Sequence, residues 1–436
     1  MNMDTMPNVE VHPQTALIDE CVAISIANLA AHEVVVLEAS CTDKNNVLWL
    51  SRATFEADKE GKVHVATQAP ISGSYQGVDP MGLFWSMKPT EKNAPRFSFE
   101  KPMLEVCLSV FSQNRRIAQK KIFRLLVSLD IEKREIQEQG VVGTLFYQKG
   151  MKKQPGIMVV PGSNGGIPEA TAQLLASHGY TVLALGYFGA KGLPENLQEI
   201  PLEYFQNAMR WLKKQTLVAN GTVTLFGTSR GGELVLLVAA MFPGEMDRII
   251  AYLPSNLVYG SFPELSKPAW TYQNRPVAYM PSASNEEILR ASTEGKIPFH
   301  AGTFEDPLEY TPIFLYELEV FQQYREEATI PVEHIRCPLL LFSGEEDALW
   351  PSALYGALVM ERLESQGSPI ARKHMSFPNA GHGFKYPYFP SIDLPDHFSE
   401  ELWCIMGGTA EGNVYAARES WSEVFKFLKT NSDRGL

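Results

Sequence analysis

The stretch Thr222–Leu234, TVTLFGTSRGGEL, is a short β-prone run that breaks at glycines and continues as an apolar segment through Ala240. This pattern predicts a strand, a sharp turn and a helix, with Ser229 at the apex of a Gly-x-Ser-x-Gly elbow. The glycines let strand and helix approach without Cβ clashes, and the seryl oxygen then stands clear of the backbone. Ser229 is therefore the candidate nucleophile. Because chance also produces such short patterns, the surrounding sequence must decide whether it is functional.

Length and composition indicate a soluble globular protein. The chain has 436 residues, 45% of them hydrophobic, which suits two or three domains with substantial cores. It contains no apolar run of about eighteen residues. It begins Met1-Asn2-Met3-Asp4, without the basic and apolar regions of a signal peptide, so we expect a cytoplasmic protein with no membrane span. The net charge of −12 disfavours nonspecific binding to nucleic acid.

The cysteines indicate a reduced protein without a zinc site. There are five of them, an odd number, and no two form a Cys-x-x-Cys pair. This spacing argues against a disulfide framework and against structural zinc. We expect most of these side chains to be buried packing residues.

The first 130 residues have the period of two that is typical of strands. Apolar side chains occupy every second position over residues 104–110 and again over residues 123–129, starting at Leu104 and Phe123. Turn-forming clusters separate other strand candidates, so residues 1–135 are predicted to form an immunoglobulin-like all-β sandwich domain. The charged stretch 131–139 has little to bury and is expected to be an exposed final strand or a linker at the domain junction.

From Gly140 onward, strands alternate with helices, which predicts an α/β domain over residues 136–436 with a mostly parallel sheet. Compact apolar runs at 156–160, 181–185, 249–253 and 338–342 are the strand candidates, and a helix with one apolar face follows Pro201. Functional groups of such a sheet lie at the carboxyl ends of its strands. About eighty residues, 254–337, interrupt the alternation; they form either a cap over the active site or an ordinary packed excursion.

A seryl hydroxyl needs a base, and the base needs an orienting acid. The strand at 338–342 is followed by Glu345, Glu346 and Asp347, where a sheet of this class carries its acid. Asp347 is the preferred candidate, its two neighbours are competitors, and a solvated acidic loop is the alternative. Of nine histidines, His382 alone lies between two glycines, which would let its imidazole project into a cleft. The order Ser229, Asp347, His382 is the one expected of an α/β-hydrolase.

Two backbone N–H groups are expected to stabilise the oxyanion that forms on the attacked carbonyl. Arg230 supplies one, and Ser163 or a neighbour, in the loop PGSNGG after the first strand, supplies the other. The alternative for this loop is an ordinary tight turn. The side chain of Arg230 has three possible roles: contact with an anionic substrate, pairing with Glu233, or exposure to solvent. Neither a His-Glu-x-x-His motif nor a phosphate-binding loop occurs, so no metal or other cofactor is expected.

At this point the sequence resembles the acyl-CoA thioesterases and the bile acid-CoA:amino acid N-acyltransferases. The resemblance covers nearly the whole chain and is carried by LWLSRATFEAD at 48–58, GSYQGVDPMGLFWSM at 73–87, HGY at 178–180, ALGYFG at 184–189 and PLEYF at 201–205. It implies a β-sandwich joined to an α/β-hydrolase domain, a triad of Ser229, Asp347 and His382, and acyl-CoA as substrate.

The nucleophile separates the branches of that family, since the amino-acid-conjugating members carry cysteine at the elbow. Ser229 therefore favours water as the acyl acceptor, and we expect an acyl-CoA thioesterase. The alternatives are an N-acyltransferase, a carboxylesterase or peptidase on the same fold, and a non-enzymatic scaffold. The chain ends Asp433-Arg434-Gly435-Leu436, unlike a Ser-Lys-Leu tail, which argues against peroxisomal targeting.

Overall fold

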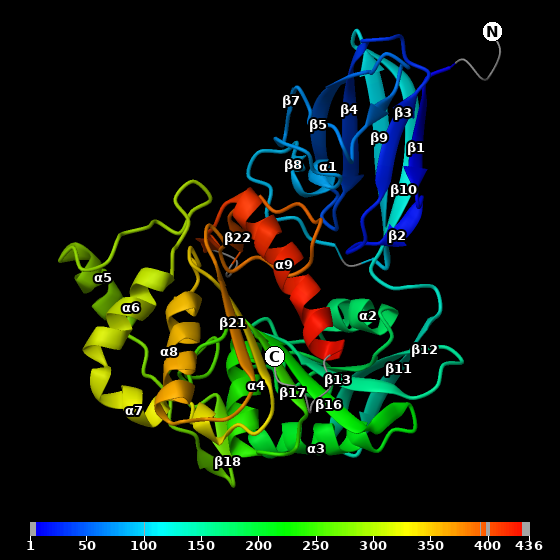
Figure 1. Ribbon diagram of the computed structural model, residues 1–436. Coiled ribbons are helices and arrows are strands. Elements are labelled where there is room, and N and C mark those ends of the chain that lie inside the picture. The colour runs from blue at the N-terminus through cyan, green and yellow to red at the C-terminus, as the bar shows by residue number, and fades with distance from the viewer. Residues whose placement is uncertain (1–5, 100, 393, 398–401, 430–436) are drawn as a thin grey trace. The chain divides into compact units, whose positions relative to one another are not determined.

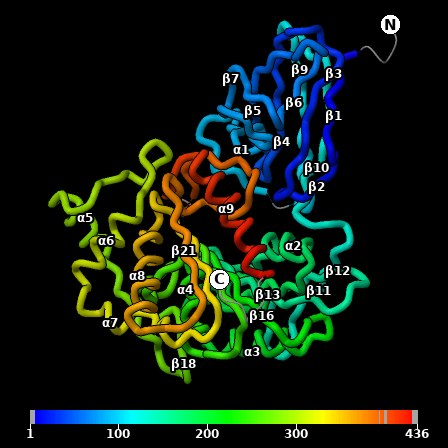
Figure 2. The backbone as a smooth tube through the Cα atoms, in the orientation of Figure 1, coloured from blue at the N-terminus to red at the C-terminus, as the bar shows by residue number. Residues whose placement is uncertain are grey.

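The computed structural model describes residues 6–99, 101–392, 394–397 and 402–429 (Figure 1). The chain forms two compact units, each described here by itself. The first comprises residues 1–127, 383–400 and 409–418, and the second comprises residues 128–382, 401–408 and 419–436. Segments that are far apart in the sequence therefore build one unit, as the tube in Figure 2 shows by its colours.

The first unit is built mainly of β-strands, as predicted for the N-terminal region. Its strands are β1 (Asn8–His12), β2 (Thr15–Leu17), β3 (Ala23–Ala27), β4 (Val34–Thr42), β5 (Leu48–Glu56), β6 (Val63–His64), β7 (Ser72–Gly73), β8 (Lys88–Pro89), β9 (Met103–Ser112) and β10 (Arg115–Leu125), with the short helix α1 (Gly82–Trp85) and the two-residue strand β22 (Asp396–His397). One sheet has the order β1-β3-β6, and the other has the order β2-β10-β9-β4-β5-β7, with β8 also paired to β5. Side chains of β4 and β5 alternate between buried and accessible positions, which is the pattern of strands with one face on a core.

The predicted alternation is confirmed on β9 but is out of phase on β10. Leu104, Val106, Leu108 and Val110 are buried, whereas β10 ends at Leu125 and Leu129 is 92% exposed. On β10 the buried side chains are those of Ile122, Arg124 and Leu125, and only the last of these is a predicted core position. A buried arginine interrupts the apolar period, so of the predicted core positions 123, 125, 127 and 129 only Leu125 is buried.

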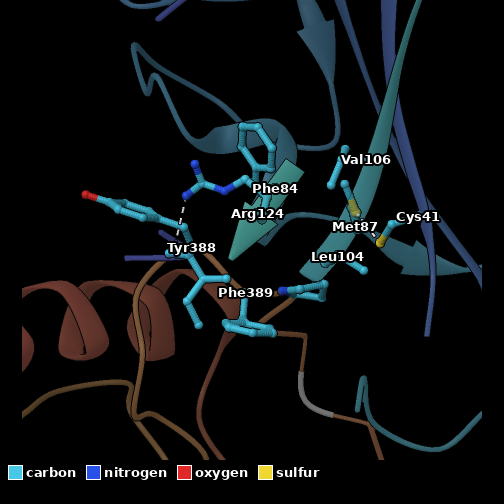
Figure 3. Close-up of a pocket in the computed structure, with 10 residues that line it drawn as sticks. Cys41, Phe84, Met87, Leu104, Val106, Arg124, Tyr388 and Phe389 are labelled. Atoms are coloured by element: carbon cyan, nitrogen blue, oxygen red, sulfur yellow. Dashed lines mark hydrogen bonds between the residues drawn. The ribbon is translucent and has the colours of Figure 1, made fainter. Parts of the chain in front are cut away.

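Arg124 is buried because its guanidinium finds partners inside the unit. It donates to the carbonyl oxygens of Ile18 at 3.0 Å and Glu20 at 2.6 Å, and it lies 5.3 Å from the centre of the Phe84 ring. Figure 3 shows it at the wall of an otherwise largely apolar cavity that Tyr388 also lines. Burial lowers the pKa of Arg124 to about 10, which still leaves it charged at neutral pH.

The second unit has the predicted α/β architecture. Its strands are β11 (Ile131–Glu138), β12 (Val141–Gln148), β13 (Gln154–Val160), β14 (Thr181–Leu185), β15 (Ile200–Pro201), β16 (Val218–Thr228), β17 (Arg248–Tyr252), β18 (Trp270–Tyr272), β19 (Arg275–Pro276), β20 (Leu339–Gly344), β21 (Arg372–Phe377) and β23 (Trp403–Cys404). Its helices are α2 (Glu169–Ser177), α3 (Leu202–Lys213), α4 (Arg230–Met241), α5 (Asn285–Thr293), α6 (Thr311–Val320), α7 (Arg325–Ala328) and α8 (Ser352–Ser365), with short 3-10 turns at Gln322–Tyr324 and Val332–His334. The helix α9 (Ala410–Lys429) is divided between the two units. Its residues up to Arg418 belong to the first unit, and its remaining residues belong to the second.

The central sheet has eight strands in the order β11-β12-β14-β13-β16-β17-β20-β21. The six strands from β14 to β21 in this order run parallel, and β12 runs antiparallel to both of its neighbours, β11 and β14. Helices cover both faces of the sheet (Figure 1). This is the expected α/β-hydrolase arrangement, in which the parallel strands present their carboxyl ends along one edge.

The charged stretch that was expected to be an exposed final strand or a linker at the domain junction lies in the second unit. Residues Ile131–Glu138 form β11, the edge strand of the eight-stranded sheet, and the predicted boundary at residue 135 falls inside it. Only Ile136 of this strand is buried. An edge strand needs few apolar side chains, and charge protects it from pairing with other chains, so its sequence looks like a linker.

Candidate active site

Ser229 lies at the tight turn between β16 and α4. Its backbone has φ +59° and ψ −124°, a left-handed conformation that is uncommon for residues other than glycine. The backbone N–H of Ser229 donates to the backbone carbonyl oxygen of Tyr252 at 2.9 Å. The carbonyl oxygen of Ser229 accepts the backbone N–H of Glu233 at 3.0 Å. These bonds hold a strained, half-buried serine in place, which is the geometry of a nucleophile elbow.

The glycine after the serine allows close contact with a third segment. A Cβ on Gly231 would overlap the carbonyl group of Pro161, in the loop that follows β13. Because β13 pairs with β16, with Val160 opposite Gly227, the two loops leave the sheet side by side. The Gly-x-Ser-x-Gly spacing therefore brings together the strand, the helix and the loop predicted to carry an oxyanion donor.

Asp347 and His382 form a buried pair. The Nδ1–H of His382 donates to Asp347 Oδ2 at 2.8 Å, and the two side chains are 7% and 1% exposed. The carboxylate also accepts the hydroxyl of Ser352 at 2.6 Å and the backbone N–H groups of Leu349 at 3.0 Å and Trp350 at 3.2 Å. Such a carboxylate has one orientation, and it holds the imidazole in the tautomer whose Nε2 can accept a proton.

Burial separates Asp347 from its two competitors. Glu345 and Glu346 are exposed, and Glu345 accepts only a hydroxyl hydrogen bond from Ser376 among the bonds observed. His382 bonds with neither of their side chains in the described residues. The choice of Asp347 as the acid therefore agrees with the geometry.

The second nitrogen of His382 has no protein partner. Across the described ranges, Nε2 is buried and forms no hydrogen bond, to Ser229 or to any other residue. The Trp350 ring lies edge-on to the imidazole, with 6.0 Å between the ring centres. Hydrogen bonds between a nucleophile and its base are often long in unliganded enzymes and tighten with substrate. The structure thus brings His382 to Asp347 but leaves the Ser229–His382 contact as a prediction.

A segment that the sequence analysis missed supports both members of this pair. The carbonyl oxygen of Met406 accepts the N–H of His382 at 2.7 Å and that of Ala348 at 3.1 Å. The next residue, Gly407, has φ +82°, and a Cβ there would overlap the carbonyl oxygen of Glu346. The Gly407-Gly408 pair was the available sign of such close backbone packing, but nothing in the sequence connects it with residues sixty positions away.

The predicted oxyanion donors lie in adjacent segments. Arg230 is the first residue of α4, where backbone N–H groups have no partner within the helix. A Cβ on Gly162 would lie 3.4 Å from Ser229 Cβ and 3.9 Å from the Arg230 nitrogen, so this loop borders the elbow. Ser163 follows Gly162 and is half-buried. That the N–H of Ser163 is the second donor stays a prediction.

The side chain of Arg230 pairs with Glu233, one of the three possibilities considered. Its Nη1 lies 2.6 Å from Glu233 Oε2, and its Nη2 donates to the carbonyl oxygens of Tyr259 at 3.0 Å and Gly260 at 2.9 Å. The two side chains are 9% and 0% exposed. Burial raises the pKa of Glu233 to about 7, against the opposing attraction of Arg230.

The insertion at 254–337 rests on the candidate site. At the start of α6, the hydroxyl of Thr311 donates to the Asp347 carbonyl oxygen at 2.6 Å. Phe314 lies 6.0 Å from Trp350, centre to centre, and Tyr259 lies 6.1 Å from it. These rings belong to a separate apolar cluster that also includes Met280, Leu318 and Tyr355. Contact with the ring beside His382 favours a cap over an ordinary excursion.

Neither a metal cluster nor a membrane-spanning helix is found in the described residues. In residues 6–99, 101–392, 394–397 and 402–429, no three His, Cys, Asp or Glu side chains come together as a metal-binding group. No helix of these ranges is both long and apolar enough to cross a bilayer.

Comparison with known proteins gives matches over both units. Residues 19–138 match the family model for the acyl-CoA thioester hydrolase/BAAT N-terminal region, and residues 200–433 match the model for the BAAT/acyl-CoA thioester hydrolase C terminal. Acyl-coenzyme A amino acid N-acyltransferase 1 of Mus musculus is 30% identical, with 96% of each chain covered. Acyl-coenzyme A thioesterase 6 of Mus musculus is 27% identical, over 94% of this chain and 93% of the relative. Bile acid-CoA:amino acid N-acyltransferase of Mus musculus is 28% identical, over 97% of each.

Proposed function

Because the chain belongs to the family of acyl-CoA thioester hydrolases and bile acid-CoA:amino acid N-acyltransferases, we propose that it hydrolyses acyl-CoA to a free carboxylic acid and CoA. The observation that carries the proposal is the nucleophile elbow, which holds a serine beside a loop suited to bind an oxyanion. A buried Asp347–His382 pair with an unoccupied Nε2, within the described residues, supplies the base. No cofactor is needed for this chemistry.

The mechanism has two half-reactions. His382 Nε2 removes the Ser229 hydroxyl proton, and the oxygen attacks the thioester carbonyl; the resulting oxyanion accepts hydrogen bonds from the N–H groups of Arg230 and Ser163. The C–S bond then breaks, and the imidazolium gives its proton to the departing CoA sulfur. Water, deprotonated by His382, attacks the seryl ester, and the proton returns to Ser229 as the acid leaves. Asp347 stabilises the imidazolium in both halves.

The alternative acceptor is an amine. The relatives named as amino acid N-acyltransferases are 30% and 28% identical to this chain, and the relative named as a thioesterase is 27% identical. A cysteinyl thioester reacts readily with amines, whereas a seryl ester depends on activated water, so Ser229 favours hydrolysis. A carboxylesterase or peptidase would use the same triad without a preference for CoA.

The test is thiol release from short, medium and long acyl-CoAs, with and without glycine or taurine. We expect free acid as the main product, and a loss of kcat of at least about 10³-fold in Ser229→Ala. Ser365→Ala, which removes an exposed hydroxyl on α8, is the matched control and should match the wild type. Full activity in Ser229→Ala, or N-acyl product in excess of free acid, would overturn the proposal.

Three finer assignments accompany this proposal. The first unit is assigned to an immunoglobulin-like sandwich domain without catalytic groups and the second unit to the catalytic domain, supported by the β-sheets of the first unit and by the triad residues in the second. The substrates are fatty acyl-CoAs, supported by the family. The location is the cytoplasm, supported by five free cysteines. The chain-length series tests the substrate assignment, and cell fractionation tests the location.

A further inference from the structure

Glu233 and Arg230 form a buried ion pair at the start of α4, next to Ser229 in the chain, and the reaction outlined above makes no use of the carboxylate. We propose that Glu233 is a positioning residue: through Arg230 it fixes the backbone N–H that binds the oxyanion, and through Tyr259 and Trp270 it fixes the start of the insertion. This inference rests on the proposed triad and deepens the account of that site.

The carboxylate of Glu233 joins three segments. It lies on α4 one turn after Ser229 and is 0% exposed. Its Oε2 accepts Arg230 Nη1 at 2.6 Å, and its Oε1 accepts the indole N–H of Trp270 at 3.1 Å and the backbone N–H of Tyr259 at 3.4 Å. Its own N–H bonds to the Ser229 carbonyl oxygen at 3.0 Å. One side chain thus connects the elbow helix with two points of the insertion.

Arg230 is held at both of its Nη groups, whereas its buried Nε forms no hydrogen bond within the described residues. Besides Glu233, it donates to the carbonyl oxygens of Tyr259 and Gly260, and its guanidinium lies 6.0 Å from the centre of the Trp270 ring. A planar guanidinium with this many fixed partners has one conformation. Its Cα, and with it the backbone N–H next to Ser229, loses the freedom to rotate away from the oxyanion position.

Without its carboxylate, Arg230 would be a buried, uncompensated cation. Breaking one partner of a buried pair is strongly unfavourable, whereas replacing both partners by apolar residues is often neutral or stabilising. Stability alone therefore does not require a charged pair at this place. What a hydrophobic pair could not supply is the set of directed bonds that fixes residue 230.

The same pair supports the base side of the site. Tyr259, whose N–H and carbonyl are both bound here, lies 6.1 Å from Trp350, and Trp350 lies 6.0 Å from His382. Loss of Glu233 should therefore disturb the oxyanion donor and the packing of the imidazole together. Both effects lower the rate of acyl transfer to Ser229 more than they weaken substrate binding.

The experiment measures two rates in the full chain carrying Glu233→Gln. One is kcat and KM for acyl-CoA; the other is the rate at which an alkyl fluorophosphonate modifies Ser229, where the seryl oxygen displaces fluoride and no CoA is required. Since one oxyanion donor is worth about 10²–10³ in rate, we expect both rates to fall roughly 30- to 300-fold with KM changed less than about threefold. Glu333→Gln is the matched control: it breaks the Arg362–Glu333 pair of the same unit, at 2.6 and 2.7 Å, and should leave both rates unchanged.

A second variant separates positioning from folding. Arg230→Met combined with Glu233→Leu removes both charges and should restore the melting temperature lost in Glu233→Gln, while the rate of phosphonylation stays at least about tenfold low. Recovery of that rate together with the melting temperature would overturn the inference, as would rates within twofold of wild type in Glu233→Gln. If the wild type reacts with the fluorophosphonate but hydrolyses no acyl-CoA, the proposed function fails, and the role of Glu233 is still decided by phosphonylation.

Discussion

Three consecutive carboxylates follow β20, and their surroundings give them different roles. Asp347 is buried and accepts four hydrogen bonds, from His382, Ser352, Leu349 and Trp350, whereas Glu345 and Glu346 point to solvent. A carboxylate with this many donors is held in one orientation, which is what the orienting acid of the predicted triad needs. The distinction depends on which side chain reaches the imidazole, since all three can carry the same charge.

Asp347→Asn tests this distinction most directly. The amide can hold the histidine only in the wrong tautomer, so we expect kcat for acyl-CoA to fall by about 10⁴-fold with the fold intact. Glu345→Gln and Glu346→Gln are the controls and should stay within about twofold of wild type. Steady-state kinetics with circular dichroism as a check of folding measure both. A larger loss in either glutamate variant than in Asp347→Asn would move the acid to that residue.

At the scale of elements, the loop 406–408 joins the two loops that carry Asp347 and His382. Gly407→Ala should disrupt this contact, because its Cβ would overlap the Glu346 carbonyl in a backbone with φ +82°. Left-handed strain alone costs about 1–2 kcal/mol. Gly295→Ala isolates that strain, since Gly295 has φ +71° and nothing within 4 Å of the added Cβ.

We therefore expect Gly407→Ala to lower stability more than Gly295→Ala does and to lower kcat at least about tenfold, which Gly295→Ala should not. Urea unfolding and thiol release measure the two effects. Equal behaviour of the two variants would mean that the three loops can separate without harm to the triad.

The helix α6 of the insertion contains a buried acid, Glu317, which is 3% exposed and accepts the Ala283 N–H at 2.8 Å. Burial raises its pKa to about 7 from 4.5. Between these values the folded chain keeps a proton that the unfolded chain has lost, so this group makes the free energy of unfolding fall as pH rises from about 4.5 to about 7. The total change is on the order of 3 kcal/mol.

Glu317→Gln keeps the acceptor and removes the titration. Relative to wild type, the variant should gain stability between about pH 5 and about pH 8, measured by urea unfolding. Glu319→Gln, an exposed position on the same helix, should show no such gain. A difference between Glu317→Gln and wild type that is independent of pH would contradict the buried-acid assignment.

The parts of this site that sequence could predict are those with a local signature. Ser229 and His382 each lie between nearby glycines, and Asp347 follows a recognisable strand. These local patterns and the order of the three residues in the chain were the basis for predicting the triad. Arg124 was missed because its partners, two backbone carbonyls about a hundred residues away, leave no local pattern. The strand Ile131–Glu138 was interpreted as the domain junction because this edge strand buries only one side chain. Met406 acts through its backbone carbonyl, which any residue could supply.

At the scale of the whole molecule, the first unit draws on three stretches of chain. Val414 is 5% exposed in its apolar cluster, and Tyr388 packs against the same cluster. Fully burying one such side chain contributes about 1.5–3 kcal/mol. A fragment of residues 1–135 lacks both.

We expect trypsin to degrade the isolated 1–135 fragment roughly 10- to 100-fold faster than it degrades the same residues in the full chain, because proteolysis follows the population of opened molecules. Mass spectrometry of the early cleavage products measures this. Equal resistance of the fragment and the full chain would show that residues 383–400 and 409–418 add nothing to the unit.

Because the first unit is built from three separate stretches of chain, its parts are synthesised at different times. The stretch that ends at Val127 leaves the ribosome first, but the last segment of its unit ends at Arg418. At a translation rate of about 5–20 residues per second, the interval between the synthesis of Val127 and that of Arg418 is roughly 15–60 s. The strands translated first are thus among the last to acquire a complete core, and during that interval a nascent sandwich with an unfilled interior is exposed to chaperones.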